Sequence, residues 1–126
     1  MATSFVATEV TTVPLDGVPT VGFSEGQDFG GGYLLLQREL NETEQDRRLG
    51  LIGTYVEFGD QSRSGYGCVE SLTLQRNSAK LVLTANAAAQ FKEQEISVAF
   101  NLGDRDFEAL TSAISQIVAS SRLNVL

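Results

Sequence analysis

The sequence contains no histidine and only one cysteine among its 126 residues. The absence of histidine excludes Ser-His-Asp and Cys-His triads, proton transfer by imidazole and nearly every zinc site that uses histidine ligands. Cys68 alone cannot form an internal disulfide, which agrees with a reducing cytosol. A catalytic Cys68 would need a nearby cation or helix N-terminus to lower its thiol pKa, so its predicted strand position favours a packed thiol.

Long apolar runs and an export signal are also missing. The longest uninterrupted apolar run is the four-residue segment from Tyr33 to Leu36, whereas a membrane-spanning helix needs ~20 such residues. The first five residues have neither the basic start nor the apolar segment of a signal peptide. We therefore expect a cytoplasmic protein without a membrane partner.

Basic residues are few, with nine Lys and Arg against 16 Asp and Glu and a formal charge of -7. This balance argues against nucleic-acid binding through a broadly basic surface. An acidic surface favours and steers a basic partner, although the charge is also explained by solubility alone, and both interpretations stay open. A hydrophobic share of 42% and the chain length predict a single domain, residues 1–126, with its own core.

The second half of the chain has the most regular pattern. Apolar residues with a period of two predict three consecutive antiparallel strands at residues 67–76, 79–85 and 95–101. An amphipathic helix follows, for which Asp104 is the expected N-cap. Its apolar stripe consists of Phe107, Leu110, Ile114, Ile117 and Val118. This helix would cover the dry face of the sheet.

The first half predicts further strands, at residues 3–13, 18–23, 33–39 and 51–58. Asp16-Gly17 is suited to a tight hairpin turn between the first two. Residues 41–48 are polar and form either a loop or a short exposed helical turn, residues 59–65 are expected to be a loop, and residues 86–92 form either a helical turn or a connection. The fold class is therefore α+β, a mostly antiparallel sheet of about six to seven strands with a C-terminal helix packed on one face.

Few residues of the sequence are suited to catalysis. Glu57 with Asp60, or Glu57 with Glu70, could act as acid and base in the manner of glycosidases. Acidic residues on neighbouring strands are more simply explained as a solvated face, and no cofactor or metal is expected. A rival hypothesis is a small-ligand-binding or enzymatic pocket on the sheet face that uses Tyr55, Glu57 and Glu70.

Four segments resemble one family of bacterial proteins: YLLLQR from Tyr33, GTYVE from Gly53, SGYGCVE from Ser64 and FNLGD from Phe100. Together they are similar to the tenth family of immunity proteins of polymorphic-toxin systems. The resemblance implies an α+β protein that binds and neutralises a cognate toxin in bacterial competition and performs no catalysis.

If the resemblance holds, function depends on recognition, and two segments offer suitable side chains. Arginine and tyrosine are enriched at binding hot spots, and acidic groups attract a basic toxin surface. The residues expected to face the toxin are Asp60, Gln61, Arg63 and Tyr66 in one segment and Glu42, Glu44 and Asp46 in the other. The alternative for Tyr66 is a structural role, and a further alternative for the protein is a homodimer that pairs through exposed strand edges.

Overall fold

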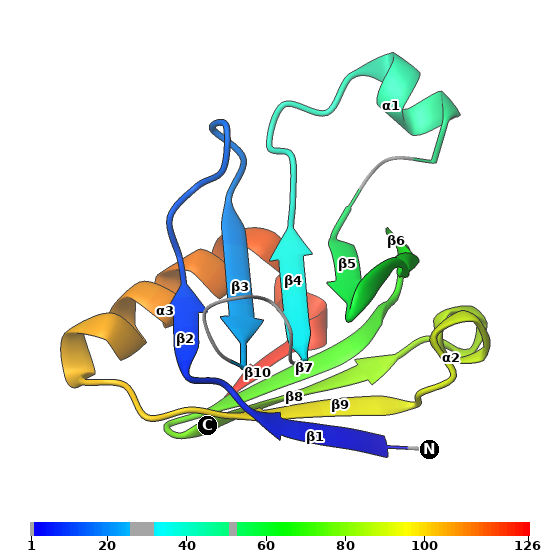
Figure 1. The fold of residues 1–126 in the computed structure, drawn as a ribbon. Helices are drawn as coiled ribbons and strands as arrows, with labels where there is room; N and C mark the ends of the chain where they lie inside the picture. The colour runs from blue at the N-terminus through cyan, green and yellow to red at the C-terminus, as the bar shows by residue number, and fades with distance from the viewer. Residues whose placement is uncertain (1, 26–31, 51–52) are drawn as a thin grey trace.

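The computed structural model of the protein describes residues 2–25, 32–50 and 53–126, and it consists of two sheets and a long helix around a shared core (Figure 1). Sheet A has the order β1-β9-β8-β7-β10, with bounds Ala2–Val6, Glu95–Ala99, Ser78–Leu83, Val69–Gln75 and Leu123–Val125. Sheet B has the order β2-β3-β4-β5-β6, with bounds Glu9–Thr11, Thr20–Ser24, Tyr33–Gln37, Tyr55–Phe58 and Asp60–Tyr66. The helices are α1 (Glu44–Arg48), α2 (Ala85–Phe91) and α3 (Asp104–Ile117), followed by the 3₁₀ turn η1 (Ser120–Arg122).

The α+β class and the C-terminal helix are confirmed, and the strands are more numerous than predicted. Within the described residues they form two sheets of five strands each. The predicted strand at residues 3–13 is divided into β1 and β2, and β6 and β10 were not predicted. The amide of Ala7 donates to the carbonyl of Ala99 at 2.8 Å, whereas the next amide, of Thr8, donates to the carbonyl of Ser24 at 2.9 Å. The chain therefore passes from sheet A to sheet B between these two residues.

Both edges of sheet A are parallel pairs, which the sequence did not predict. β1 runs parallel to β9, with Phe5 opposite Val98, and β10 runs parallel to β7, with Leu123 opposite Leu72. Alternation of apolar and polar residues sets the faces of a strand but carries no information on its direction. The three central strands β7, β8 and β9 are antiparallel neighbours, as predicted.

Several local predictions are confirmed. Asp16 and Gly17 have φ angles of 52° and 79° and lie between the bridged residues Leu15 and Val18, as a tight turn requires. The polar run at residues 41–48 contains α1, whose first turn is held by a capping box between Thr43 and Asp46. The ambiguous segment 86–92 is helical up to Phe91, where α2 ends.

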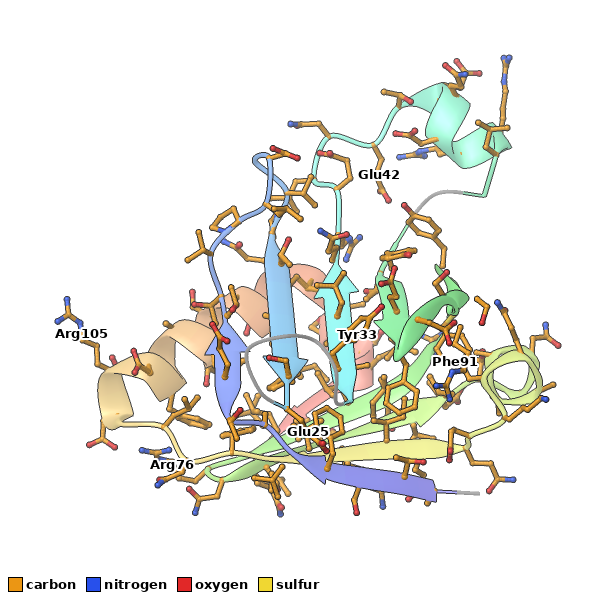
Figure 2. All side chains as sticks on the ribbon, in the orientation of Figure 1. Glu25, Tyr33, Glu42, Arg76, Phe91 and Arg105 are labelled. Atoms are coloured by element: carbon orange, nitrogen blue, oxygen red, sulfur yellow. The ribbon has the colours of Figure 1, made fainter. Side chains whose placement is uncertain are left out.

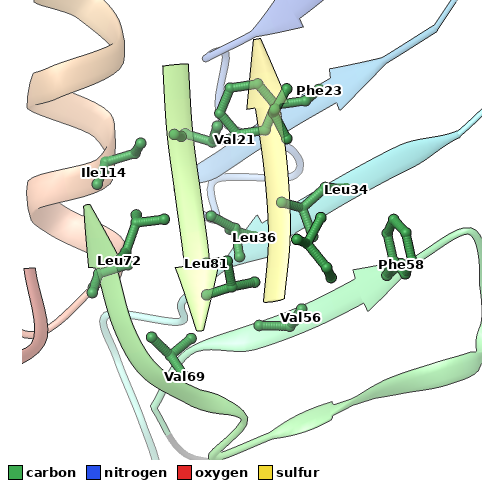
Figure 3. Close-up of a cluster of buried hydrophobic side chains, with 14 of the residues drawn as sticks. Val21, Phe23, Leu34, Leu36, Val56, Phe58, Val69, Leu72, Leu81 and Ile114 are labelled. Carbon is green, nitrogen blue, oxygen red and sulfur yellow. The ribbon is translucent and has the colours of Figure 1, made fainter. Parts of the chain in front are cut away.

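The core lies between the two sheets and α3 (Figure 3). Sheet B contributes Val21, Phe23, Leu34, Leu36, Val56 and Phe58, and sheet A contributes Leu72, Leu74, Leu81, Leu83, Ile96 and Val98. From α3, the predicted residues Leu110, Ile114 and Ile117 are fully buried. The helix begins after Gly103, which lacks a side-chain cap, so the prediction of Asp104 as N-cap was wrong and Asp104 lies in the first turn.

The segment predicted as a loop at residues 59–65 is largely strand β6, an edge of sheet B. The side-chain amide nitrogen of Gln90, on α2, donates to the carbonyl of Ser64 at 2.9 Å and to that of Ser62 at 3.4 Å. This helix therefore covers backbone groups that an edge strand would otherwise leave unpaired. None of the helices in the described ranges, of which α3 is the longest, has both the length and the apolar character needed to cross a bilayer.

Candidate binding face of sheet B

The outer face of sheet B is defined by the register of its strands. Thr11 pairs with Gly22, Gly22 with Leu35, and Leu35 with Glu57. Paired residues point to the same side of a sheet, and successive residues alternate between sides. Because Val21 and the other alternate residues fill the core, this row of four residues must face away from sheet A. We call this surface the tyrosine face, after the three tyrosines that lie on it.

All three tyrosines of the chain lie on this outer face, around a single carboxylate. The hydroxyl of Tyr33 donates to Oε2 of Glu57 at 2.5 Å, and the hydroxyl of Tyr55 donates to Oε1 at 2.7 Å. The ring of Tyr66 packs against that of Tyr55 with a centroid distance of 5.3 Å. Figure 2 labels Tyr33 on β4 and, above it in this view, Glu42 in the segment between β4 and α1. Glu57 is therefore fixed in orientation from both sides.

The environment of these tyrosines favours their neutral form. Burial, followed by the hydrogen bond to Glu57 and the negative charge of that carboxylate, raises the pKa of Tyr33 from 10.0 to about 12. The pKa of Tyr55 is raised too, mainly by burial and further by Glu57, against a lowering contribution from the hydrogen bond with Ser64. The two hydroxyls thus remain donors to Glu57 throughout the physiological pH range.

A spectrophotometric titration should detect this arrangement, and the lack of tryptophan leaves the tyrosinate absorbance unobscured. We expect Tyr33 to ionise near pH 12 in the folded protein instead of near 10.0. Since the folded state keeps a proton that the unfolded state loses, the stabilisation is complete below pH 10.0 and is lost as the pH rises to about 12. In Glu57→Gln the pKa of Tyr33 should fall toward its ordinary value while staying above it, because burial is the largest cause. Ionisation of all tyrosines in one step near the ordinary value would contradict the geometry.

The predicted residues of β6 have different surroundings from one another. Asp60 is exposed, and its carboxylate accepts hydrogen bonds from the backbone amide and hydroxyl of Ser62, which lowers the pKa of Asp60. The guanidinium of Arg63 lies over the ring of Phe58, 4.9 Å from its centroid. Tyr66 has an exposed ring on the tyrosine face, and the side chain of Gln61 lies outside the described part of the structure.

The predicted acidic residues lie in and beside α1, at the end of sheet B where β4 stops (Figure 1). A carboxylate oxygen of Glu42 accepts from the amide of Gly53 at 2.7 Å and so joins this segment to the chain that leads into β5. Glu44 forms an exposed ion pair with Arg48 at 3.1 Å. The carboxylate of Asp46 accepts a hydrogen bond from the backbone amide of Thr43, the N-cap residue of α1. All three acids therefore have partners within the chain.

The pocket hypothesized from Tyr55, Glu57 and Glu70 is not assembled. Glu70 belongs to β7 of sheet A, where it is exposed and lies 3.8 Å from a guanidinium nitrogen of Arg122. A groove of about 420 Å³ does run across the outer face of sheet B, and Glu57 lines it. Its other walls include Glu9, Gly22, Tyr33 and Leu35, without Tyr55 or Glu70.

Cys68 is a packed thiol, as predicted, although it lies between β6 and β7 and not within a strand. Its residue surface is 4% exposed, and its sulfur contacts the carbonyl oxygen of Tyr66 at 3.6 Å. Burial raises the pKa of the Cys68 thiol, which opposes the thiolate form that a nucleophile requires.

Of the residues that line the groove, sequence reasoning singled out only Glu57, and the residues that it missed include Glu9, Gly22, Tyr33 and Leu35. Tyr33 and Leu35 belong to the continuous apolar run from Tyr33 to Leu36, which has no alternation to distinguish its two faces, and Leu35 is half-buried and forms part of the groove. The available signal was Gly22 itself, because an interior strand glycine often marks a place that another molecule approaches closely.

The fold and this face define a two-sheet α+β protein with a tyrosine-rich outer sheet face. The Immunity protein 10 family matches residues 4–108, which run from β1 through the first turn of α3 and include every residue of the groove. The chain belongs to this family and is thus an immunity protein of a toxin system. Comparisons with curated proteins and with solved structures gave no match.

Proposed function

We propose that the protein binds a cognate toxin domain with a basic surface in the bacterial cytoplasm and neutralises it by protein-protein contact, without catalysis. Membership of the Immunity protein 10 family supports a toxin as the partner. The single observation that carries the proposal for this face is the clustering of every tyrosine of the chain around Glu57. Tyrosine is enriched at binding hot spots because it offers a large contact area and a polar tip at a low cost in conformational entropy.

The proposed contact surface combines the tyrosine face with the predicted partner-binding residues. Tyr66 joins the two, because it belongs to β6 and its ring packs on Tyr55. Asp60 is exposed beside this face, and Glu44 is exposed on α1, so both add negative charge that a basic toxin surface would meet during encounter. Arg63, Gln61, Glu42 and Asp46 complete the proposed set.

Growth rescue tests the proposal directly. The toxin domain encoded beside this chain should arrest growth when it is expressed alone in the bacterial cytoplasm, and co-expression of the full chain should restore growth. The purified proteins should then co-elute as a complex of defined stoichiometry. An empty vector and a chain of the same size without toxin affinity serve as controls.

Two results would refute the proposal. Growth arrest that persists although the folded protein accumulates would remove toxin neutralisation as its function. Rescue without any complex would instead favour an enzymatic action on the toxin or its product.

A further inference from the structure

The groove on sheet B has an apolar floor and an acidic rim. The half-buried side chain of Leu35 contributes to its apolar surface, and Glu9, Glu57 and Tyr33 also line it. No lysine or arginine lines it within the described residues. A side chain that fills this groove well must therefore combine an apolar stem with a positively charged end.

Glu57 can accept more hydrogen bonds than it receives from the described residues. An ionised carboxylate has about four lone-pair positions on its two oxygens. Tyr33 and Tyr55 each donate to a different oxygen, which leaves acceptor capacity on both. Because these hydroxyls hold the carboxylate in place, a cationic group that enters the groove meets an acceptor whose orientation is already fixed.

Gly22 lines the groove, and the backbone does not require glycine there. Its φ angle is outside the left-handed region, and a Cβ at this position would lie 3.9 Å from Leu35 Cδ1 and 4.0 Å from Thr11 Cβ, which are ordinary contact distances. Glycine inside a strand weakens the strand relative to residues with side chains. A glycine that neither strain nor crowding explains is accounted for by the open space above it, which a partner group can occupy.

We propose that this groove receives an arginine side chain of the toxin domain. Its aliphatic stem would lie over Gly22 and Leu35, and its guanidinium would bind Glu57 and Glu9 beside the ring of Tyr33. A planar guanidinium suits this position better than an ammonium group, because it donates in a fork to carboxylates and also stacks on aromatic rings. The inference rests on the proposed function in one respect, since it takes the toxin as the protein that carries the arginine.

A small probe tests the groove without the toxin. N-acetyl-arginine amide is added to the isotopically labelled full chain, and N-acetyl-citrulline amide, its neutral counterpart, is the matched control. We expect the arginine probe to shift the backbone amide signals of Gly22, Leu35 and Glu57 in a saturable way at millimolar concentration, with little response to citrulline. In Glu57→Gln the response to arginine should also be lost. Equal responses to the two probes, or none to either, would overturn the inference whether or not the toxin binds.

Two variants then test the groove with the toxin domain. Gly22→Thr fills the groove with a residue that favours strands, so the protein should be at least as stable as wild type while its toxin affinity falls at least about tenfold, ~1.4 kcal/mol. Glu57→Gln should weaken binding by a similar factor. Glu70→Gln, which changes an exposed carboxylate of sheet A, is the control and should leave the affinity unchanged.

The outcomes separate this inference from the proposed function. If wild-type protein binds the toxin and both groove variants bind it equally well, the groove proposal fails and toxin binding stands. If wild-type protein does not bind the toxin, the proposed function fails, and the arginine probe still decides the chemistry of the groove. A molar mass in solution twice that of the chain, which falls to that of the chain in Gly22→Thr, would identify a second copy as the occupant and overturn the assignment to the toxin.

Discussion

Replacing Ile114 with alanine should destabilise the protein by about 2–5 kcal/mol, the range measured when large aliphatic side chains are truncated in well-packed cores. Ile114 is fully buried in the middle of the α3 stripe and belongs to the cluster that both sheets share (Figure 3). Truncation removes the hydrophobic contribution of the lost methyl and methylene groups and leaves a cavity that helix and sheets cannot fully close. Urea denaturation followed by circular dichroism would measure the change.

The scale of this loss is large in comparison with the stability of a domain of this size, which is typically about 5–15 kcal/mol. Ser112→Ala on the exposed side of the same helix is the matched control, and it should change stability by no more than about 0.5 kcal/mol. Equal effects of the two substitutions would mean that α3 does not pack through the stripe that includes Ile114.

Replacing Tyr66 with alanine should weaken toxin binding by about 2 kcal/mol, or roughly 30-fold, if the tyrosine face is the contact surface. The Tyr66 residue is 37% exposed, so part of its ring surface remains available to a partner. Its packing against Tyr55 at 5.3 Å holds the ring in place before binding and limits the entropy lost in the complex. Isothermal titration calorimetry with the purified toxin domain would measure the affinity.

The same substitution should lower the stability of the free protein by only about 0.5–1.5 kcal/mol, the value of an aromatic pair, and the variant should remain folded. Val6→Ala is a suitable control because Val6 is exposed on the outer side of sheet A. An unchanged affinity in a folded Tyr66→Ala protein would remove this residue from the interface. A loss of equal size in Val6→Ala would show that the effect is not specific to sheet B.

Much of sheet A and α3 could be predicted from the sequence, because their residues alternate or repeat with a clear period. The division of the segment at residues 3–13 could not, since the apolar pattern continues through the crossing from Ala7 to Thr8. β6 was missed for a different reason. Its sequence DQSRSGY is polar on both faces and so has no apolar alternation. An edge strand can have such a sequence, and here the side chain of Gln90 on α2 also donates a hydrogen bond to its backbone.

The candidate site could be predicted only in part. Tyr66, Arg63 and Asp60 stand close together in the sequence, so their residue types were sufficient to select them. The relation of Tyr33 and Gly22 to Glu57 depends on the pairing of β3, β4 and β5, and a register shift by one residue would have turned them toward the core. Residue types alone therefore did not reveal this relation.

The edge strands of sheet A limit the order in which the two sheets can form, because each of them pairs with a strand that is distant in the sequence. The hydroxyl of Thr3, on β1, donates to the carboxylate of Glu93, a residue 90 positions later, and β1 has no partner in sheet A until β9 has been synthesised. Bringing such distant segments together costs loop-closure entropy before any contact compensates for it, and topologies of this kind fold slowly. Sheet B, in contrast, is built from successive antiparallel pairs between residues 9 and 66, so during synthesis on the ribosome every strand of the tyrosine face emerges before the strands that complete sheet A.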